Sequence, residues 1–358
     1  MNTSDLQQEK ALLLQCRSGF ESDCAAEIQD RAGRLGIAGY CRAQPGDAHV
    51  LFQAYEPEAA TRLMAELDFR ELIFARQWFV VLAELRELPV SDRAGPVAAA
   101  FPLRRARELS LEYPDTNEGK ALSAFCRKFS RPLENALTQR GLKLGHPAEP
   151  RLHVFFLDSS HAFVGLSDPA NSAAWPLGIP RLRMPRQAPS RSTLKLEEAL
   201  LLFLDEEERD RRLKPGLSAI DLGASPGGWT WQLARRGLRV TAVDNGPMSE
   251  EVMATGMVEH LRADGFTYRP EKMVDWLVCD MVEQPSRIAG LMADYLAEGY
   301  CREAVFNLKL PMKKRYQAVQ DALHLIDRRL RRSGLDFTLA CKQLYHDREE
   351  VTVHLRRL

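Results

Sequence analysis

Lys309 is the residue whose surroundings first suggest a chemical role. It lies in AVFNLKLP, residues 304–311, where five apolar side chains surround one ammonium group and a proline ends the run. Lysine is seldom fully buried without a partner, and parallel sheets bind their ligands at the carboxyl ends of the strands. A strand-end lysine can instead extend to solvent and pair with a surface acid. We expect a functional role, because Lys309 ends an otherwise buried strand.

The stretch IDLGASPGGWTWQL, residues 220–233, is typical of a strand, a glycine-rich turn and the start of a helix. Gly223, Gly227 and Gly228 let the backbone pass close to a bound molecule, and the first helical turn has free N–H groups. The spacing is not the G-x-G-x-x-G of dinucleotide sites. Asp221 would repel a pyrophosphate but suits an amino group. The pattern therefore favours S-adenosylmethionine (AdoMet), which has a zwitterionic amino-acid end and a cationic sulfur.

Three more aspartates follow successive predicted strands. Asp244 comes 23 residues after Asp221, at the usual place of a carboxylate that binds ribose hydroxyls. Asp264 could accept a hydrogen bond from an adenine amino group, and Asp280 follows the fourth strand. Each aspartate alone is typical of a turn, but their recurrence indicates a cofactor pocket.

The residues around Asp280 exclude two kinds of methyl transfer. The sequence there is VCDMVEQ, without the Asn/Asp-Pro-Pro-aromatic motif that grips a planar amine. Cys279 lacks the neighbouring proline expected of a cysteine nucleophile in pyrimidine C5 methylation. A set of charged residues at strand ends and on the preceding helix fits better: Lys195, Asp280, Lys309 and Glu350.

The elements that must position these residues alternate between strand and helix after residue 190. We predict strands at 217–224, 238–244, 257–263, 274–280 and 303–310, and helices at 191–207, from 227, at 284–298 and at 314–333. The last two strands, 336–344 and 349–357, have only a short loop between them and must pair antiparallel. The expected fold is α/β, a Rossmann-like doubly wound sheet that ends in an antiparallel hairpin.

The first half of the chain has a different pattern. Residues 11–86 read as βαββαβ, the α+β ferredoxin-like arrangement. A mixed region follows and includes a predicted hairpin of residues 151–158 and 161–167. The expected domains are 1–88 (ferredoxin-like), 89–180 (RNA-binding), 181–190 (a basic linker) and 191–358 (catalytic).

Five segments resemble FtsJ-like ribose 2′-O-methyltransferases: SRSTLKLEEA (190–199), DLGASPGGW (221–229), CDM (279–281), FNLKLP (306–311) and REEV (348–351). The stretch PLGIPRLRMPRQAPSRSTLKLEEALL, residues 176–201, resembles the junction between a THUMP RNA-binding domain and a methyltransferase domain. The whole chain is similar to a family of bacterial ribosomal RNA large-subunit methyltransferases. That resemblance implies AdoMet-dependent 2′-O-methylation of a cytidine in 23S rRNA.

The resemblance also assigns roles to residues. Lys195, Asp280, Lys309 and Glu350 correspond to the family's catalytic Lys-Asp-Lys-Glu pattern, with Lys309 as the base or as a clamp for the hydroxyl. Glu349 is the alternative to Glu350, which we prefer because an apolar strand residue, Val351, follows it. The predicted cofactor-binding residues are Ser192, Asp221, Gly223, Ser225, Pro226, Gly227, Gly228, Trp229, Asp244, Asp264 and Asp280.

The distribution of charge suggests an RNA partner. The 358-residue chain has 49 basic and 49 acidic residues, so its overall charge says nothing about a polyanion. However, no acidic residue lies between Asp168 and Glu197, and the prolines there predict an extended segment that suits a phosphate backbone. RNA contacts are expected from Arg181, Arg183, Arg186, Arg191, Lys313 and Lys314. A third basic stretch, RRLRR at 328–332, has the pattern of a solvated helix face.

Composition limits the remaining possibilities. The seven scattered cysteines and the histidines lack metal-ligand spacing, and the N-terminus lacks a signal-peptide pattern. We expect a cytoplasmic monomer without a metal or a membrane partner, acting on 23S rRNA or a large-subunit precursor. The alternatives are a non-catalytic RNA-binding assembly factor and an AdoMet enzyme for a protein or small molecule. The basic linker and the N-terminal 180 residues argue against a small-molecule substrate.

Overall fold

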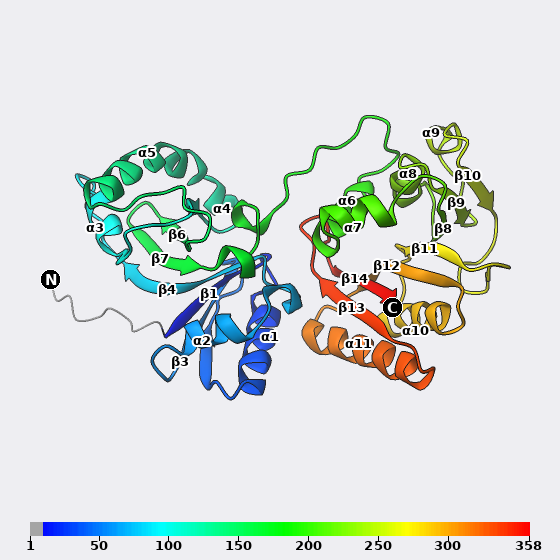
Figure 1. The fold of residues 1–358 in the computed structure, drawn as a ribbon, viewed down its shortest axis with the longest axis horizontal. Coiled ribbons are helices and arrows are strands. Elements are labelled where there is room, and N and C mark those ends of the chain that lie inside the picture. The colour runs from blue at the N-terminus through cyan, green and yellow to red at the C-terminus, as the bar shows by residue number, and fades with distance from the viewer. Residues whose placement is uncertain (1–9) are drawn as a thin grey trace. The chain divides into compact units, whose positions relative to one another are not determined.

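The computed structural model describes residues 10–358, which divide into two compact units at the Pro180–Arg181 boundary. Residues 1–9 include most of the N-terminal segment that lacks a signal-peptide pattern, and they lie outside the described residues. No helix within residues 10–358 is long and apolar enough to cross a membrane. Each unit is built on one seven-stranded sheet (Figure 1).

The first unit begins with the predicted βαββαβ order. Its elements are β1 (Ala11–Gln15), α1 (Glu21–Arg34), β2 (Gly39–Arg42), β3 (His49–Ala54), α2 (Ala59–Glu66), η1 (Phe69–Glu71) and β4 (Gln77–Leu85). These strands lie in the order β2-β3-β1-β4, and every neighbouring pair is antiparallel. The split order follows from the two helical crossovers, so the ferredoxin-like prediction is confirmed.

The rest of the first unit extends the same sheet. Its elements are α3 (Ala94–Ala99), β5 (Leu109–Glu112), α4 (Asn117–Lys120), α5 (Ser123–Gln139), β6 (Arg151–Asp158), β7 (His161–Ser167), η2 (Pro169–Asn171) and η3 (Pro176–Gly178). β7 pairs antiparallel with β4, so the sheet continues as β4-β7-β6-β5 without a break. The two halves therefore share one hydrogen-bonded sheet, although the sequence suggested a division near residue 88.

A buried polar network holds the end of the first unit. The Glu112 carboxylate at the end of β5 lies 2.7 Å from Nδ1 of His153 and accepts hydrogen bonds from Gln15 Nε2 and from the backbone N–H of Leu177. Burial raises the pKa of Glu112, but the opposing effects of His153 and these hydrogen bonds lower it overall. The network fixes the segment that leads into the basic linker.

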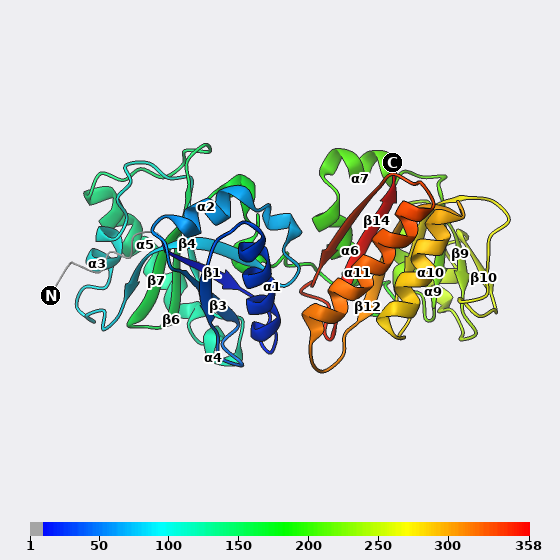
Figure 2. The same cartoon turned by 90° about the horizontal axis from the view of Figure 1, so that it is seen from below.

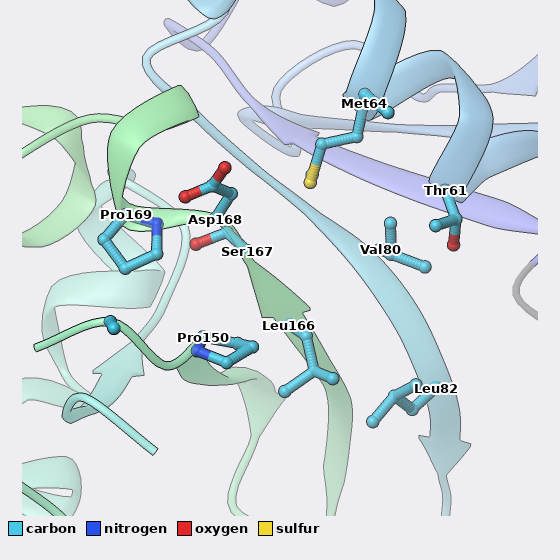
Figure 3. Close-up of a pocket in the computed structure, with 11 residues that line it drawn as sticks. Thr61, Met64, Val80, Leu82, Pro150, Leu166, Ser167, Asp168 and Pro169 are labelled. Carbon is cyan, nitrogen blue, oxygen red and sulfur yellow. The ribbon is translucent and has the colours of Figure 1, made fainter. Parts of the chain in front are cut away.

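The first unit also contains a pocket of about 420 Å³ on one face of the sheet (Figure 3). Met64 of α2, Val80 and Leu82 of β4, and Leu166 of β7 give it an apolar lining. Asp168 is the ionisable residue of this lining, and its carboxylate already accepts a hydrogen bond from the N–H of Ala170. The described residues of this lining therefore include no pair of ionisable side chains that would suggest a catalytic site.

The second unit follows the predicted alternation. Its elements are α6 (Thr193–Phe203), α7 (Glu206–Arg212), β8 (Ser218–Leu222), α8 (Gly228–Ala234), β9 (Arg239–Val243), α9 (Glu250–Met253), β10 (Val258–Leu261), β11 (Val274–Cys279), α10 (Pro285–Ala297), β12 (Cys301–Lys309), α11 (Arg315–Arg332), β13 (Phe337–Lys342) and β14 (Glu350–Arg357).

The sheet of the second unit has the strand order β10-β9-β8-β11-β12-β14-β13. The first five strands are parallel, and β14 runs antiparallel to both β12 and β13. α10 and α11 lie side by side on one face, and α6 and α8 lie on the other (Figures 1 and 2). The predicted doubly wound sheet with a final antiparallel hairpin is confirmed.

Two details of the second unit differ from the prediction. The single helix expected at 191–207 is two helices, because Asp205 starts a new one. Its carboxylate accepts a hydrogen bond from the N–H of Glu208, whose own carboxylate accepts from the N–H of Asp205, a reciprocal cap. The short helix α9 was not predicted.

Candidate active site

Three of the four predicted catalytic side chains meet at the carboxyl edge of the second sheet. Lys195 is on α6, Asp280 follows β11, and Glu350 begins β14. The Lys195 ammonium lies 2.5 Å from Glu350 Oε1 and 3.3 Å from Asp280 Oδ1. All three side chains are largely shielded from solvent, with exposures of 17%, 22% and 10% for Lys195, Asp280 and Glu350. The cluster therefore joins a helix and two strands through one ammonium group.

Lys309, the fourth residue, ends β12 directly opposite Glu350 in the antiparallel register. Opposed residues of an antiparallel pair project from the same face of the sheet, with Cβ atoms about 5 Å apart. Within residues 10–358 no ion pair joins the half-buried Lys309 to a carboxylate. The backbone thus places Lys309 beside the cluster and leaves its ammonium unengaged by an acid there.

The two adjacent glutamates at the start of β14 have different partners. Glu350 contacts Lys195, whereas Glu349 Oε2 lies 3.1 Å from Arg315 Nη2 and its side chain is 50% exposed. Successive strand residues project from opposite faces. Glu350, and not Glu349, is therefore the residue brought to the other charged groups.

The cluster shifts the pKa values of its members. Burial lowers the pKa of Lys195, but the carboxylates of Asp280 and Glu350 outweigh this effect and raise it overall. Burial raises the pKa of Asp280, although Lys195 and a hydrogen bond from Asn307 oppose that shift. Lys195 therefore remains a cation at neutral pH and orients the two carboxyl groups on either side of it.

A buried chain of hydrogen bonds behind the cluster was missed from sequence. Asn307 Nδ2 donates to Asp280 Oδ1 at 2.6 Å, and Thr352 Oγ1 lies 2.7 Å from Asn307 Oδ1 and 3.1 Å from Asp347 Oδ2. Burial raises the pKa of Asp347 well above its ordinary range. A protonated Asp347 would donate to Thr352, which then donates to Asn307, so every group has a consistent role.

Two signals in the sequence could have located this chain. Asn307 lies two residues before Lys309, and Thr352 lies two residues after Glu350, so each shares a sheet face with a predicted catalytic residue. Glu198 is a further missed residue. Its buried carboxylate accepts hydrogen bonds from the N–H groups of Tyr345 and His346. It thereby ties the loop before β14 to α6.

A pocket of about 370 Å³ lies beside the cluster, at the ends of the parallel strands. Gly223, Asp244, Asp264 and Asp280 line it, all of them predicted cofactor residues. Gly223 has a φ of +75°, in the left-handed region that favours glycine, and a Cβ there would collide with Met281. Gly227 caps α8 with a φ of +114°. The turn between β8 and α8 therefore depends on both glycines.

Asp221 provides a test of the AdoMet prediction. It is 1% exposed, and Thr230 Oγ1 donates to its Oδ2 at 2.6 Å, while Oδ1 is buried without a partner. Burial, together with the nearby Asp280, raises the pKa of Asp221 to about 7 despite that hydrogen bond. A buried carboxylate oxygen without a donor is costly. It fits a ligand that supplies an amino group, as AdoMet does.

The other predicted cofactor residues have structural partners as well. Asp244 accepts hydrogen bonds from the N–H groups of Ser225 and Gly246, and Asp264 accepts from that of Phe266. Both carboxylates therefore shape turns at the pocket. Ser225 and Pro226 lie in the turn before α8, and the Ser192 hydroxyl is 2.6 Å from that of Ser190, next to Gly228.

Trp229 differs from the other predicted cofactor residues. Its side chain is 2% exposed and packs in the apolar core of the second unit. Its side chain is therefore not available to a ligand, and only its backbone N–H lies in the first turn of α8.

The predicted RNA contacts are exposed. Arg181, Arg183, Arg186 and Arg191 lie outside any helix or strand, as expected for an extended linker. Lys313 and Lys314 are exposed in the turn between β12 and α11. Their neighbour Met312 is 91% exposed, so this turn presents both cations and an apolar group close to Lys309.

Comparisons with known proteins cover both units. Residues 9–79 match the RlmM ferredoxin-like domain, residues 92–168 match the N-terminal domain of ribosomal RNA large subunit methyltransferase M, and residues 188–334 match the FtsJ-like methyltransferase family. Among solved structures, TrmN from Thermus thermophilus aligns over 97% of this chain and 99% of its own, with 16% identity and a TM-score of 0.36.

Curated relatives are similar along nearly their whole length. The ribosomal RNA large subunit methyltransferase M of Azotobacter vinelandii is 55% identical, over 97% of this chain and 98% of its own. The protein of the same name from Aromatoleum aromaticum is 54% identical, over 96% of this chain and 94% of its own. The chain therefore belongs to the ribosomal RNA large subunit methyltransferase M family.

Proposed function

We propose that this protein transfers the methyl group of AdoMet to the 2′-hydroxyl of a cytidine in bacterial 23S rRNA. The observation that carries the proposal is the Lys195–Asp280–Glu350 cluster with Lys309 directly opposite Glu350, beside a glycine-bounded pocket. Membership of a family of ribosomal RNA methyltransferases supports the substrate class. The cytidine and the 2′-oxygen come from the sequence resemblance.

AdoMet supplies the methyl group on a cationic sulfur, and the chain's residues hold and orient it. Asp221 would accept the ligand's amino group through its unpartnered Oδ1. Asp244 would accept from ribose hydroxyls and Asp264 from the adenine amino group, both at the lining of the pocket. The backbone around Gly223 and Gly227 would permit close approach.

The acceptor hydroxyl is a poor nucleophile at neutral pH, so its proton must be removed or its oxygen must be held in line. Lys309 is the residue for either task. As a base, Lys309 Nζ would take the proton from the 2′-oxygen as the C–O bond forms. As a clamp, a charged Lys309 would donate a hydrogen bond to that oxygen. Lys195, Asp280 and Glu350 would position the group in both cases.

RNA would be held by the exposed arginines of the linker and by Lys313 and Lys314 next to Lys309. The partner would be 23S rRNA or a precursor of the large subunit in the cytoplasm. Access to a 2′-hydroxyl requires a single-stranded or splayed-out nucleotide. The enzyme is proposed to act as a monomer, since its proposed site lies wholly within the second unit.

The decisive experiment uses labelled AdoMet with unmodified 23S rRNA, followed by mass-spectrometric mapping of the product. We expect one cytidine to gain a 2′-O-methyl group. Label on a base, or on a protein, would overturn the reaction proposed. RNA binding without any label transfer would favour the non-catalytic assembly factor instead.

A further inference from the structure

A second pocket of about 460 Å³ in the catalytic unit is strongly basic. Six of its eleven lining residues are cations: Arg211, Arg212, Lys214, Arg302, Arg356 and Arg357. The chain as a whole has equal numbers of basic and acidic residues. A concentration of six cations around one pocket therefore departs sharply from the average surface.

The pocket lies at the edge of the sheet opposite the cofactor site. Its lining comes from the end of α7 and the turn after it, from the starts of the parallel strands β8, β11 and β12, and from the end of the antiparallel strand β14. Arg302 and Lys309 stand near opposite ends of β12, seven residues apart. At about 3.3 Å per residue, their backbones are roughly 23 Å apart. The basic pocket is thus distinct from the site of methyl transfer.

Carboxylates neutralise only part of this charge. Arg211 lies 3.8 Å from Glu207, Arg212 is paired with Glu303 and Glu208, and Arg302 lies 3.8 Å from Asp275 with its side chain 65% exposed. Within the described chain, no ion pair joins a carboxylate to Lys214, Arg356 or Arg357. The lining has six cations and two carboxylates, Asp275 and Glu303, and the adjacent Glu207 and Glu208 of α7 bring the net side-chain charge to +2.

The chemistry of these groups favours phosphate. A guanidinium offers a planar fork of N–H donors that matches phosphate oxygens, and clustered cations repel one another unless an anion lies between them. We propose that this pocket is a second RNA-binding site that holds backbone phosphates remote from the target nucleotide. The inference rests on the proposed RNA substrate, and it adds a contact surface on the far edge of the catalytic unit.

The site should raise affinity without changing chemistry. Each phosphate contact releases counterions, so the logarithm of the binding constant falls with the logarithm of salt concentration by about 0.7 to 0.9 per contact. An RNA that contacts both the catalytic pocket and the basic pocket must span the sheet from one end of its parallel strands to the other. It must therefore contain more nucleotides than the catalytic pocket alone can bind. The pocket therefore contributes to the binding of a large RNA.

The test is a triple variant, Lys214→Gln, Arg302→Gln and Arg357→Gln, in the full chain. Binding to a 23S rRNA transcript is measured across a salt series, and AdoMet affinity is measured by calorimetry. We expect RNA affinity to fall by about tenfold or more at low salt and the salt slope to fall by about 2. AdoMet affinity should stay within twofold, which also shows that the variant is folded.

The matched control removes three exposed arginines of α11 that do not line the pocket: Arg328→Gln, Arg331→Gln and Arg332→Gln. It makes the same change in net charge on the same unit, and we expect the salt slope to change by less than half as much. An unchanged slope in the pocket variant, or an equal loss in the control, would overturn the inference. The methylation assay on the wild type separately tests the proposed function, because RNA binding is measured without turnover.

Discussion

At the scale of single residues, Lys309 is distinguished by what surrounds it. Lys195 is already engaged by two carboxylates, whereas Lys309 stands opposite Glu350 without an acid of its own within residues 10–358. An ammonium held firmly between carboxylates is a poor base, since they favour its charged form. We therefore propose a structural role for Lys195 and a chemical role for Lys309.

Replacing Lys309 separates these roles. Lys309→Ala should lower kcat for methyl transfer by about 100-fold or more, because a base or clamp at the reacting oxygen is lost. AdoMet affinity by calorimetry should stay within about twofold, since Lys309 is not among the residues that line the cofactor pocket. Near-normal turnover in this variant would remove Lys309 from the mechanism.

A second substitution distinguishes base from clamp. Lys309→Arg keeps the positive charge and hydrogen-bond donors but cannot act as a base at neutral pH. If Lys309 is a clamp, this variant should recover much of the activity lost in Lys309→Ala. If Lys309 is a base, both variants should be equally impaired in single-turnover methylation of the rRNA.

Asp221 should make cofactor binding depend on pH. Its pKa of about 7 leaves the carboxyl group protonated at pH 5 to 6, whereas a cationic amino group requires the ionised form. AdoMet affinity should therefore rise as the pH increases to about 7.5, and binding at pH 6 should release a proton. Calorimetry in buffers of different ionisation enthalpy measures this directly, and Asp221→Asn should bind AdoMet weakly without the proton release.

The Asp221 carboxyl group should also make the free energy of unfolding depend on pH. In the unfolded chain an aspartate ionises near pH 3.9, but in the folded protein Asp221 keeps its proton up to about pH 7. Since the folded state binds more protons, stability without ligand should fall as the pH rises from about 4 to 7. Urea unfolding at pH 5 and pH 7 should show this fall in the wild type and a smaller one in Asp221→Asn.

At the scale of elements, the pairing of β12 with β14 builds the site. The register sets Lys309 opposite Glu350 and Asn307 opposite Thr352, so one strand pair holds both the charged residues and the hydrogen-bonded chain behind them. A slip of β14 by one residue would turn Glu350 and Thr352 to the opposite face of the sheet from Lys309 and Asn307. The register of β14 against β12 therefore determines which side chains meet in the site.

Substitution of Thr352 tests whether the hydrogen-bonded chain between β12 and β14 positions the charged residues. Thr352→Val keeps the shape of the side chain but removes the hydroxyl that contacts both Asn307 Oδ1 and Asp347, while Asp347 still accepts from the N–H of Leu344. We expect kcat to fall about tenfold, because Asn307 would hold Asp280 less firmly, while AdoMet affinity changes little. Thr352→Ser should restore most of the activity. Equal losses of kcat and stability in both variants would point to packing and not to positioning.

The fold was largely predictable at this scale because buried parallel strands are continuous apolar runs separated by helical periods. Charged residue types after β11, at the start of β14 and on the helix before the sheet also located Asp280, Glu350 and Lys195. The break between α6 and α7 and the four-residue α9 were missed, since short helices have too few turns to show a period. The roles of Asn307, Thr352, Asp347 and Glu198 depend on sheet register and rotamers, which a single sequence does not reveal.

At the scale of the whole molecule, the basic linker joins two units that each have their own sheet and core. Its arginines are exposed and lie outside regular structure, so trypsin should cleave between residues 181 and 191 before it cleaves elsewhere. If these arginines contact RNA, a 23S rRNA transcript should slow that cleavage at low salt and not at high salt. AdoMet alone is the control and should not protect; full cleavage with RNA bound would argue against linker contacts.

The continuous sheet of the first unit limits how that unit can be divided. Residues 9–79 and 92–168 match separate families, yet β4 and β7 hydrogen-bond to each other across that divide. In the intact unit the sheet ends in β2 and β5, which have only four residues each. Separating the segments would expose two longer apolar strands whose free edges invite aggregation. We therefore expect that neither segment folds by itself and that recombination or truncation between them yields insoluble fragments.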